Sequence, residues 1–347
     1  MENTKNTLSS QLMPPSGGIR GVLAVLKDRI LRSTPEKLLA FASLLALLMF
    51  FSCASPNFLG IDNVVSILQS TAVNGILAIA CTFVIITAGI DLSVGTLMTL
   101  CAVIAGVFLS LWEIPLFVGI FAAIAFGSLC GLISGVLVAK LKIPPFIATL
   151  GMMMLYKGLS LVITGARPIY FNNASGFSAI SLDSWIGNLF PKFPIPNAVV
   201  IMFLLAIAAH IILKKTIFGR YIFALGSNEE ALRLSGVRVD FWKMSVYTFG
   251  GGICGVAGLL IASRLNSAQP ALGQGYELDA IAAAVIGGAS LAGGVGTILG
   301  TILGAFIMSV LINGLRIMSV AQEWQTVVTG IVIILAVYVD NARRRRQ

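Results

Sequence analysis

Charged and catalytic side chains are scarce in this chain of 347 residues. Asp, Glu, Lys and Arg make up 11% of it, and there is one histidine. No histidine–carboxylate cluster has the spacing of a metal site, and no nucleophile stands beside a base. The five cysteines lie in or at the ends of apolar runs without paired spacing, so no disulfide framework is indicated. We expect no catalytic residue, metal or cofactor in this chain.

The sequence also lacks a nucleotide-binding GxxxxGK[ST] loop, so we do not expect it to hydrolyse ATP itself. The net charge is +9, but the distribution of the basic residues argues against a nucleic-acid-binding function. The basic residues cluster in the first 37 residues, at Lys140 and Lys142, between Lys214 and Lys243, and at Arg343–Arg346. Such clustering follows the positive-inside rule, which predicts that these regions and both termini are cytoplasmic.

Apolar residues are abundant instead, at 57% of the chain. They form runs of about 17 to 25 residues, enough to cross a bilayer core of about 30 Å as helices. The sequence therefore predicts an all-α, polytopic integral membrane protein with about ten spans. We expect them at 38–54, 64–88, 96–112, 115–138, 145–164, 197–213, 244–262, 279–292, 297–315 and 324–340.

The predicted organisation is a polar cytoplasmic segment at 1–37, a transmembrane domain at 38–340 and a basic cytoplasmic tail at 341–347. Ten crossings place the basic clusters on one side, as the charge rule requires. The run at 279–292 is the shortest and is interrupted by glycines, which predicts a re-entrant or broken helix buried in protein.

Glycines recur at four-residue spacing in three of the predicted spans. In lipid such spacing favours close packing of helix backbones. The predicted packing residues are Gly127, Gly131, Gly135, Gly251, Gly255, Gly296, Gly300 and Gly304.

A polar stripe marks the second span. Ser66, Ser70 and Asn74 share one helical face, and polar atoms that face lipid are penalised. The stripe suits hydrogen bonding between helices or the lining of a hydrated pathway, and a pathway of this kind would suit an uncharged, hydroxyl-bearing solute.

Two acids begin the eighth run. Glu277 and Asp279 would stabilise a helix N-terminus there, and the same pair could dock or gate an external partner with a basic patch. Arg264 lies nearby in sequence, so an internal salt bridge is an equal alternative.

The segment from Gly219 to Gly236 is polar and lies between apolar spans. Its charged and small residues favour a short helix with glycine boundaries at a membrane surface, available to a partner. A solvated loop is the alternative.

Taken together, the motifs resemble those of sugar-type ABC importer permeases, the ribose importer permeases most closely. The resemblance runs from about Pro56 to Asn341. It is carried by SPNFLGIDN (55–63), ITAGIDLSVG (86–95), FIATLGMMML (146–155), GRYIFALGSNEEALRLSGV (219–237), SAQPALGQGYELDAIAA (267–283) and GGASLAGGVGTILGT (287–301).

This resemblance implies a multi-pass subunit of the bacterial inner membrane, working as a homodimer. ATPase subunits that bind ATP and Mg would dock inside, and a soluble sugar-binding protein outside. A monosaccharide such as ribose would pass between the two copies by alternating access. Other pentoses, hexoses and autoinducer-2 are the alternative substrates. The coupling loop would lie within 214–243, and the residues matching the family's contact with the ATPase are Gly219, Arg220, Ala224, Gly226, Asn228, Ala231, Arg233 and Gly236.

An ion-coupled secondary sugar transporter is the alternative function. It would require an ionisable site near the membrane midplane. The acids in this sequence lie at segment ends instead.

Overall fold

The structure is a computed structural model that describes residues 35–189 and 194–344. The chain divides into two units, residues 1–39 and 40–347, and the second unit contains nearly all of the described helices. The predicted polar segment at 1–37 lies almost entirely outside the described residues.

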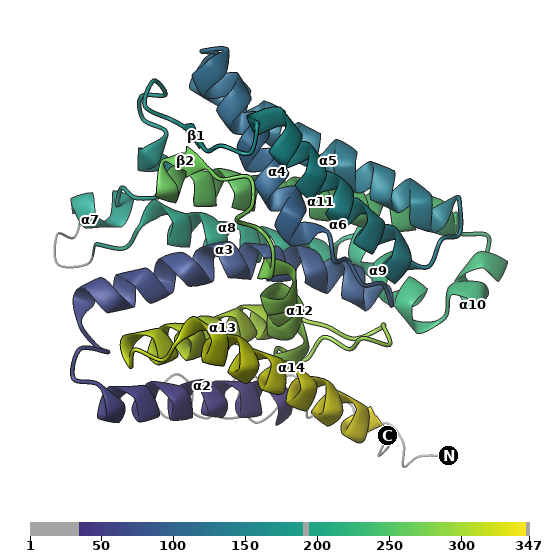
Figure 1. The fold of residues 1–347 in the computed structure, drawn as a ribbon. Helices are drawn as coiled ribbons and strands as arrows, with labels where there is room; N and C mark the ends of the chain where they lie inside the picture. Colours follow the sequence, from purple (N-terminus) through teal and green to yellow (C-terminus); the bar gives the residue numbers. More distant parts are fainter. Residues whose placement is uncertain (1–34, 190–193, 345–347) are drawn as a thin grey trace, which may run out of the picture. The chain divides into compact units, whose positions relative to one another are not determined.

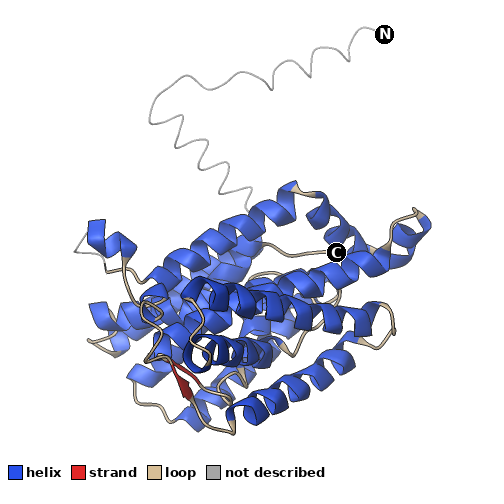
Figure 2. Ribbon diagram, turned by 90° about the horizontal axis from the view of Figure 1, so that it is seen from above, coloured by secondary structure: helices blue, strands red, loops and turns tan. Residues whose placement is uncertain are grey.

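The described chain is helical apart from loops and one pair of short strands (Figure 2). The helices are α2 (Pro35–Ala54), α3 (Ile61–Ile86), α4 (Val94–Gly106) with a π-helical turn (Val107–Leu111), α5 (Leu116–Ala139), α6 (Pro145–Thr164), α7 (Trp185–Leu189), α8 (Asn197–Lys215), α9 (Ile217–Ser227), α10 (Glu229–Leu234), α11 (Val239–Leu265), α12 (Tyr276–Ile286), α13 (Ile298–Ile317) and α14 (Gln322–Arg344). A 3₁₀ turn covers Ser178–Ile180, and the strands are β1 (Ile169–Tyr170) and β2 (Ser267–Ala268).

Within the described residues, seven helices are long and apolar enough to cross a membrane: α3, α4 with its π-helical turn, α5, α6, α8, α11 and α13. Helices α2 and α14 contain shorter apolar stretches, Leu38–Ala54 and Gln322–Tyr338. The all-α membrane fold is thus confirmed, and the count of about ten spans is not. Helix α14 continues to Arg344, so the predicted tail at 341–347 begins inside a helix.

Helix α12 belongs to an interrupted segment. Its 11 residues rise about 16 Å, roughly half of a bilayer core. The sequence places this run at 279–292, whereas the helix begins at Tyr276 and ends at Ile286, before the glycines. Gly288, Gly293 and Gly294 have positive φ angles, which end the helical backbone there.

The chain before α12 runs alongside α4. Strands β1 and β2 pair antiparallel, with Ile169 opposite Ala268. A Cβ on Gly106 would lie 3.1 Å from the Ile169 side chain, and a Cβ on Gly273 would collide with the carbonyl oxygen of Gly95. Gly106 and Gly95 are about 16 Å apart along α4. The non-helical chain therefore extends about this far beside a membrane helix before α12 begins.

Helices α3 and α11 form the centre of the bundle (Figure 1). Helix α11 packs against α5, α4 and α3, and α3 packs in addition against α8, α12 and α13. The second half of α3 is buried on all sides. Its apolar sequence fits this position, because an all-round apolar helix is stable only inside protein or lipid.

Glycines set the distance between α5 and α11. A Cβ on Gly127 would collide with the carbonyl oxygen of Gly251, and one on Gly131 with that of Tyr247. Gly135 and Gly255 lie equally close to the opposite helix, their added Cβ atoms 2.8 Å from the Cα atoms of Met244 and Ile124. The two backbones touch over several turns, as expected for small-residue packing in membranes.

The third glycine ladder packs α13 against α12 and α3. A Cβ on Gly300 would collide with the carbonyl oxygen of Gly287, and one on Gly304 with that of Ala283. Gly296 precedes α13 and lies against the side chain of Ile86. The short helix α12 is thereby held directly on the backbone of α13.

We predict that Gly251→Ala lowers the melting temperature of the detergent-purified protein, since the added methyl group forces α5 and α11 apart. Overpacking of this kind costs about 1–3 kcal/mol. Gly151→Ala is the matched control, because a Cβ at that position on α6 has no described atom of another helix within 4 Å. An equal melting temperature for the two variants would contradict the close-packing role of Gly251.

Candidate functional site

The predicted coupling segment leaves α8 through a sharp turn. Thr216 caps α9, with its hydroxyl accepting a 3.3 Å hydrogen bond from the Gly219 amide. A Cβ on Gly219 would collide with the carbonyl oxygen of Leu213 in the last turn of α8. Only glycine permits α9 to begin this close to α8.

Aromatic side chains fix α9 to the bundle. The Phe218 ring lies 6.1 Å from that of Phe83 on α3 and 5.8 Å from that of Phe249 on α11, centroid to centroid. The Tyr221 ring lies 4.7 Å from that of Trp242 on α11. Such pairs contribute beyond their buried area, by about 0.5–1.5 kcal/mol each. A displacement of α9 would therefore press on both central helices.

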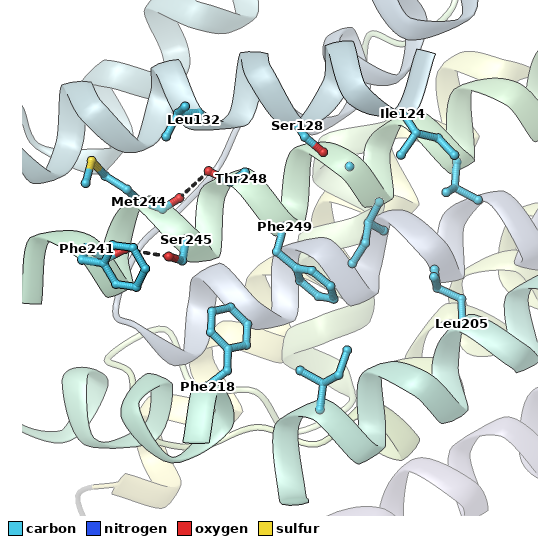
Figure 3. Close-up of a pocket in the computed structure, with 14 residues that line it drawn as sticks. Ile124, Ser128, Leu132, Leu205, Phe218, Phe241, Met244, Ser245, Thr248 and Phe249 are labelled. Carbon is cyan, nitrogen blue, oxygen red and sulfur yellow. Dashed lines mark hydrogen bonds between the residues drawn. The ribbon is translucent and has the colours of Figure 1, made fainter. Parts of the chain in front are cut away.

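A groove of about 680 Å³ lies beside this aromatic cluster, between α5, α8 and α11 (Figure 3). Phe218 and Phe249 line it together with mainly apolar side chains. The hydroxyls of Ser245 and Thr248 donate 2.8 Å hydrogen bonds to carbonyls of their own helix, at Phe241 and Met244. These hydroxyls are already engaged, so the groove suits apolar chains better than a polar solute.

The far end of α9 rests on two other segments. A Cβ on Gly226 would collide with the carbonyl oxygen of Ile86, the last residue of α3. The same oxygen accepts a 2.8 Å hydrogen bond from the amide of Gly294, in the loop between α12 and α13. Gly226 thus joins α9 to the ends of α3 and of the α12–α13 loop at one point.

Helix α10 is held by capping and ion pairs. The Asn228 side chain accepts a 2.9 Å hydrogen bond from the Ala231 amide. The Glu229 carboxylate binds Arg233 at 2.9 Å and Lys243 of α11 at 2.5 Å. The first two contacts stabilise α10 itself, and the Lys243 contact orients it relative to the first turns of α11.

The prediction of a single short helix with glycine boundaries between Gly219 and Gly236 is therefore wrong. Two helices meet at Asn228, because its side chain caps the second of them. Gly219 and Gly226 lie inside α9 at close backbone contacts, and only Gly236, with φ of 81°, follows a helix end.

The predicted coupling residues divide by exposure. Gly219 is buried and Ala224 and Gly226 are half-buried, so these three shape the segment. The exposed members, available to a partner, are Arg220, Asn228, Ala231, Arg233 and Gly236.

The structure adds a residue that the sequence analysis missed. Leu234, the last residue of α10, is 84% exposed. It places an apolar group next to Arg233 on the exposed face of α10. The sequence shows Leu234 only as an apolar residue in a polar segment. It does not reveal whether such a side chain is exposed or buried.

A second group of predicted residues meets between α3 and α11. The Arg264 guanidinium donates a 3.4 Å hydrogen bond to the Ser70 hydroxyl. This bond joins the polar stripe predicted on the second span to the group of charged residues predicted near the start of the eighth run. Ser66 is half-buried. Asn74 is 7% exposed, and its side-chain oxygen has no hydrogen-bond partner among the described residues.

The two acids of α12 have different surroundings. Glu277 is 5% exposed, and its carboxylate accepts hydrogen bonds of 3.0 and 3.1 Å from the Gly275 amide. This buried position suits the helix-stabilising role and leaves it no surface for docking. Asp279 is half-buried. In the described ranges no ion pair joins Arg264 to either acid, so the alternative internal salt bridge is not formed.

Residues 63–337 match a family model described as the permease component of a branched-chain amino acid transport system. The chain belongs to this permease family. In the part of the chain that the structure describes, no group of three or more His, Cys, Asp and Glu side chains could hold a metal ion.

Curated relatives of this permease match over nearly their whole length. The chain is 45% identical to the ribose import permease protein RbsC of Escherichia coli (strain K12), over 87% of this chain and 92% of the relative. It is 40% identical to RbsC of Bacillus subtilis (strain 168), over 89% and 94%. It is 34% identical to the xylose transport system permease protein XylH of Escherichia coli (strain K12), over 96% and 97%. No solved structure matches.

We predict that Glu229→Gln accelerates hydrogen exchange of the α10 amides, because it removes the ion pair inside α10 with Arg233 and the pair with Lys243 that ties α10 to α11. Exposed pairs contribute about 0.2–1 kcal/mol each, so the effect is a few-fold and local. The neighbouring exposed Glu230→Gln is the control, since Glu230 forms no ion pair among the described side chains. Equal exchange in the two variants would show that the pairs do not order α10.

Proposed function

We propose that this permease is the membrane subunit of an ATP-driven importer for a monosaccharide, a ribose-like pentose. The observation that carries the proposal is the identity of 40–45% to ribose import permeases over about nine-tenths of each chain. The 34% identity to a xylose transport permease supports a pentose more broadly.

The α9–α10 segment is the proposed contact with ATPase subunits that bind ATP and Mg. Its exposed residues, Arg220, Arg233 and Leu234, offer two charged groups and one apolar anchor. Its buried side contacts α3 through Phe83 and Ile86. Closure of the ATPases would move α9, and these contacts would transfer the movement to the central helices.

The complete importer would contain two copies of this chain in the bacterial plasma membrane, with the α9–α10 end and both termini in the cytoplasm. A soluble sugar-binding protein would dock at the opposite end, where β1 and β2 lie. The sugar would pass between the copies by alternating access, so the hydrolysis of ATP in the partner subunits drives uptake.

Reconstitution tests this function directly. Proteoliposomes that contain this chain, its ATPase and its binding protein should take up labelled ribose only with ATP, and excess xylose should compete more weakly than unlabelled ribose. Uptake driven by a proton or sodium gradient without the ATPase would instead establish the ion-coupled alternative.

We predict that Arg233→Glu reduces co-purification of the ATPase subunits and ATP-driven uptake by about tenfold or more, as expected for a charged group at an interface centre. Arg167→Glu is the matched control for co-purification, because this exposed arginine follows α6 at the β1 end, away from α9 and α10. Normal co-purification and uptake with Arg233→Glu would count against the coupling assignment. So would labelling of a cysteine at position 234 from the extracytoplasmic side.

A further inference from the structure

The non-helical chain before α12 exposes polar side chains beside a membrane helix. Pro270 and Gly273 are buried towards α4, while Gln269, Ala271 and Gln274 are exposed. Non-helical backbone at membrane depth is tolerated where it is buried in protein or lines a water-filled cavity. The exposed edge of this segment is therefore not a lipid contact.

A charged residue of α6 faces the same edge. Lys157 lies 13 residues into a 20-residue apolar helix, and its ammonium donates a 2.8 Å hydrogen bond to the side-chain oxygen of Gln274. A charge this far inside a span faces protein or water, and such residues mark solute and ion pathways. The lysine turns towards the non-helical chain rather than extending to the membrane surface.

The start of α12 continues this polar face. Tyr276 and Asp279 are half-buried there. The Asp279 carboxylate has no hydrogen bond or ion pair with any described residue. Arg264 in turn reaches Ser70, one turn from the unpartnered oxygen of buried Asn74.

The chemistry of this set fits a neutral, polyhydroxylated solute. Amide, carboxylate, guanidinium and phenol groups offer donors and acceptors close together, and each hydroxyl of a sugar both donates and accepts. Hydrogen bonds to charged groups are the stronger ones, and the flat face of a tyrosine ring can pack against the apolar face of a sugar ring. The set carries charges of both signs, Lys157 and Arg264 against Asp279, which suits a ligand whose hydroxyls both donate and accept.

We propose that Lys157, Gln269, Gln274, Tyr276, Asp279 and Arg264 form one wall of the translocation pathway and bind the hydroxyl groups of the monosaccharide. We call this set the broken-span face. The proposal rests on the proposed import function and assigns the place in this chain where the sugar is held during passage.

Cysteine accessibility tests the hydration of this face independently of transport. In a Cys53→Ser background, where the remaining native cysteines are buried, Gln269→Cys and Gln274→Cys should react with a membrane-impermeant maleimide in the reconstituted complex. Phe121→Cys is the lipid-facing control, because Phe121 is 70% exposed on apolar α5, and it should not react. Absence of reaction at both 269 and 274 would overturn the proposal.

Transport kinetics test recognition. Asp279→Asn should raise the KM for ribose uptake by about tenfold, the effect of losing a charged hydrogen-bond acceptor, and should change the ratio of ribose to xylose uptake. The amount of complex recovered with the ATPase subunits should equal the wild-type amount, which a folding defect would not allow. Gln322→Ala, at the exposed start of α14, should leave the KM and the ratio unchanged.

The outcomes separate the two proposals. Wild-type uptake with an unchanged KM and sugar ratio in Asp279→Asn would overturn the binding role of this face and leave the import function standing. Failure of the wild-type complex to take up any monosaccharide with ATP would overturn the import function itself, whatever the maleimide shows.

Discussion

Direct contact between helix backbones at glycine residues is the constraint on which this fold depends. In lipid, apolar side chains gain nothing by leaving the bilayer for the protein, so close packing of backbones provides much of the association. Gly127 and Gly251 bring α5 onto α11, and Gly300 and Gly304 hold α12 on α13. The second contact positions α12, whose 11 residues are too few to cross a bilayer.

The same constraint links the proposed coupling segment to the proposed pathway. Gly226 places α9 on the last carbonyl of α3, and Gly294 of the α12–α13 loop binds that carbonyl too. Helix α3 carries Ser70 and Asn74 on the polar side of the bundle. A movement at α9 would therefore reach the proposed pathway through backbone contacts and one helix.

The sequence predicts the long helices well, because an apolar run of membrane length has few alternatives. The run at 64–88 became a helix from Ile61 to Ile86, and that at 145–164 matches its helix at both ends. The division of 219–236 into two helices was missed, since Asn228 is recognised as a cap only once the turn is formed. The contact of Lys157 with Gln274 joins residues 117 apart, and only the folded bundle brings them together. Likewise, the two-residue strands carry too little pattern to be detected.

The strand pair gives the chain before α12 one fixed end. Ala268 is anchored opposite Ile169, whereas the other end meets α12 at Gly275, whose φ of 100° suits a residue without a side chain. Two residues before this joint, Gly273 lies directly on the carbonyl of Gly95 in α4, so the segment is held at both ends. It therefore acts as a fixed strut between α4 and α12, and a tilt of α12 would be passed on to α4 instead of being absorbed in the chain between them.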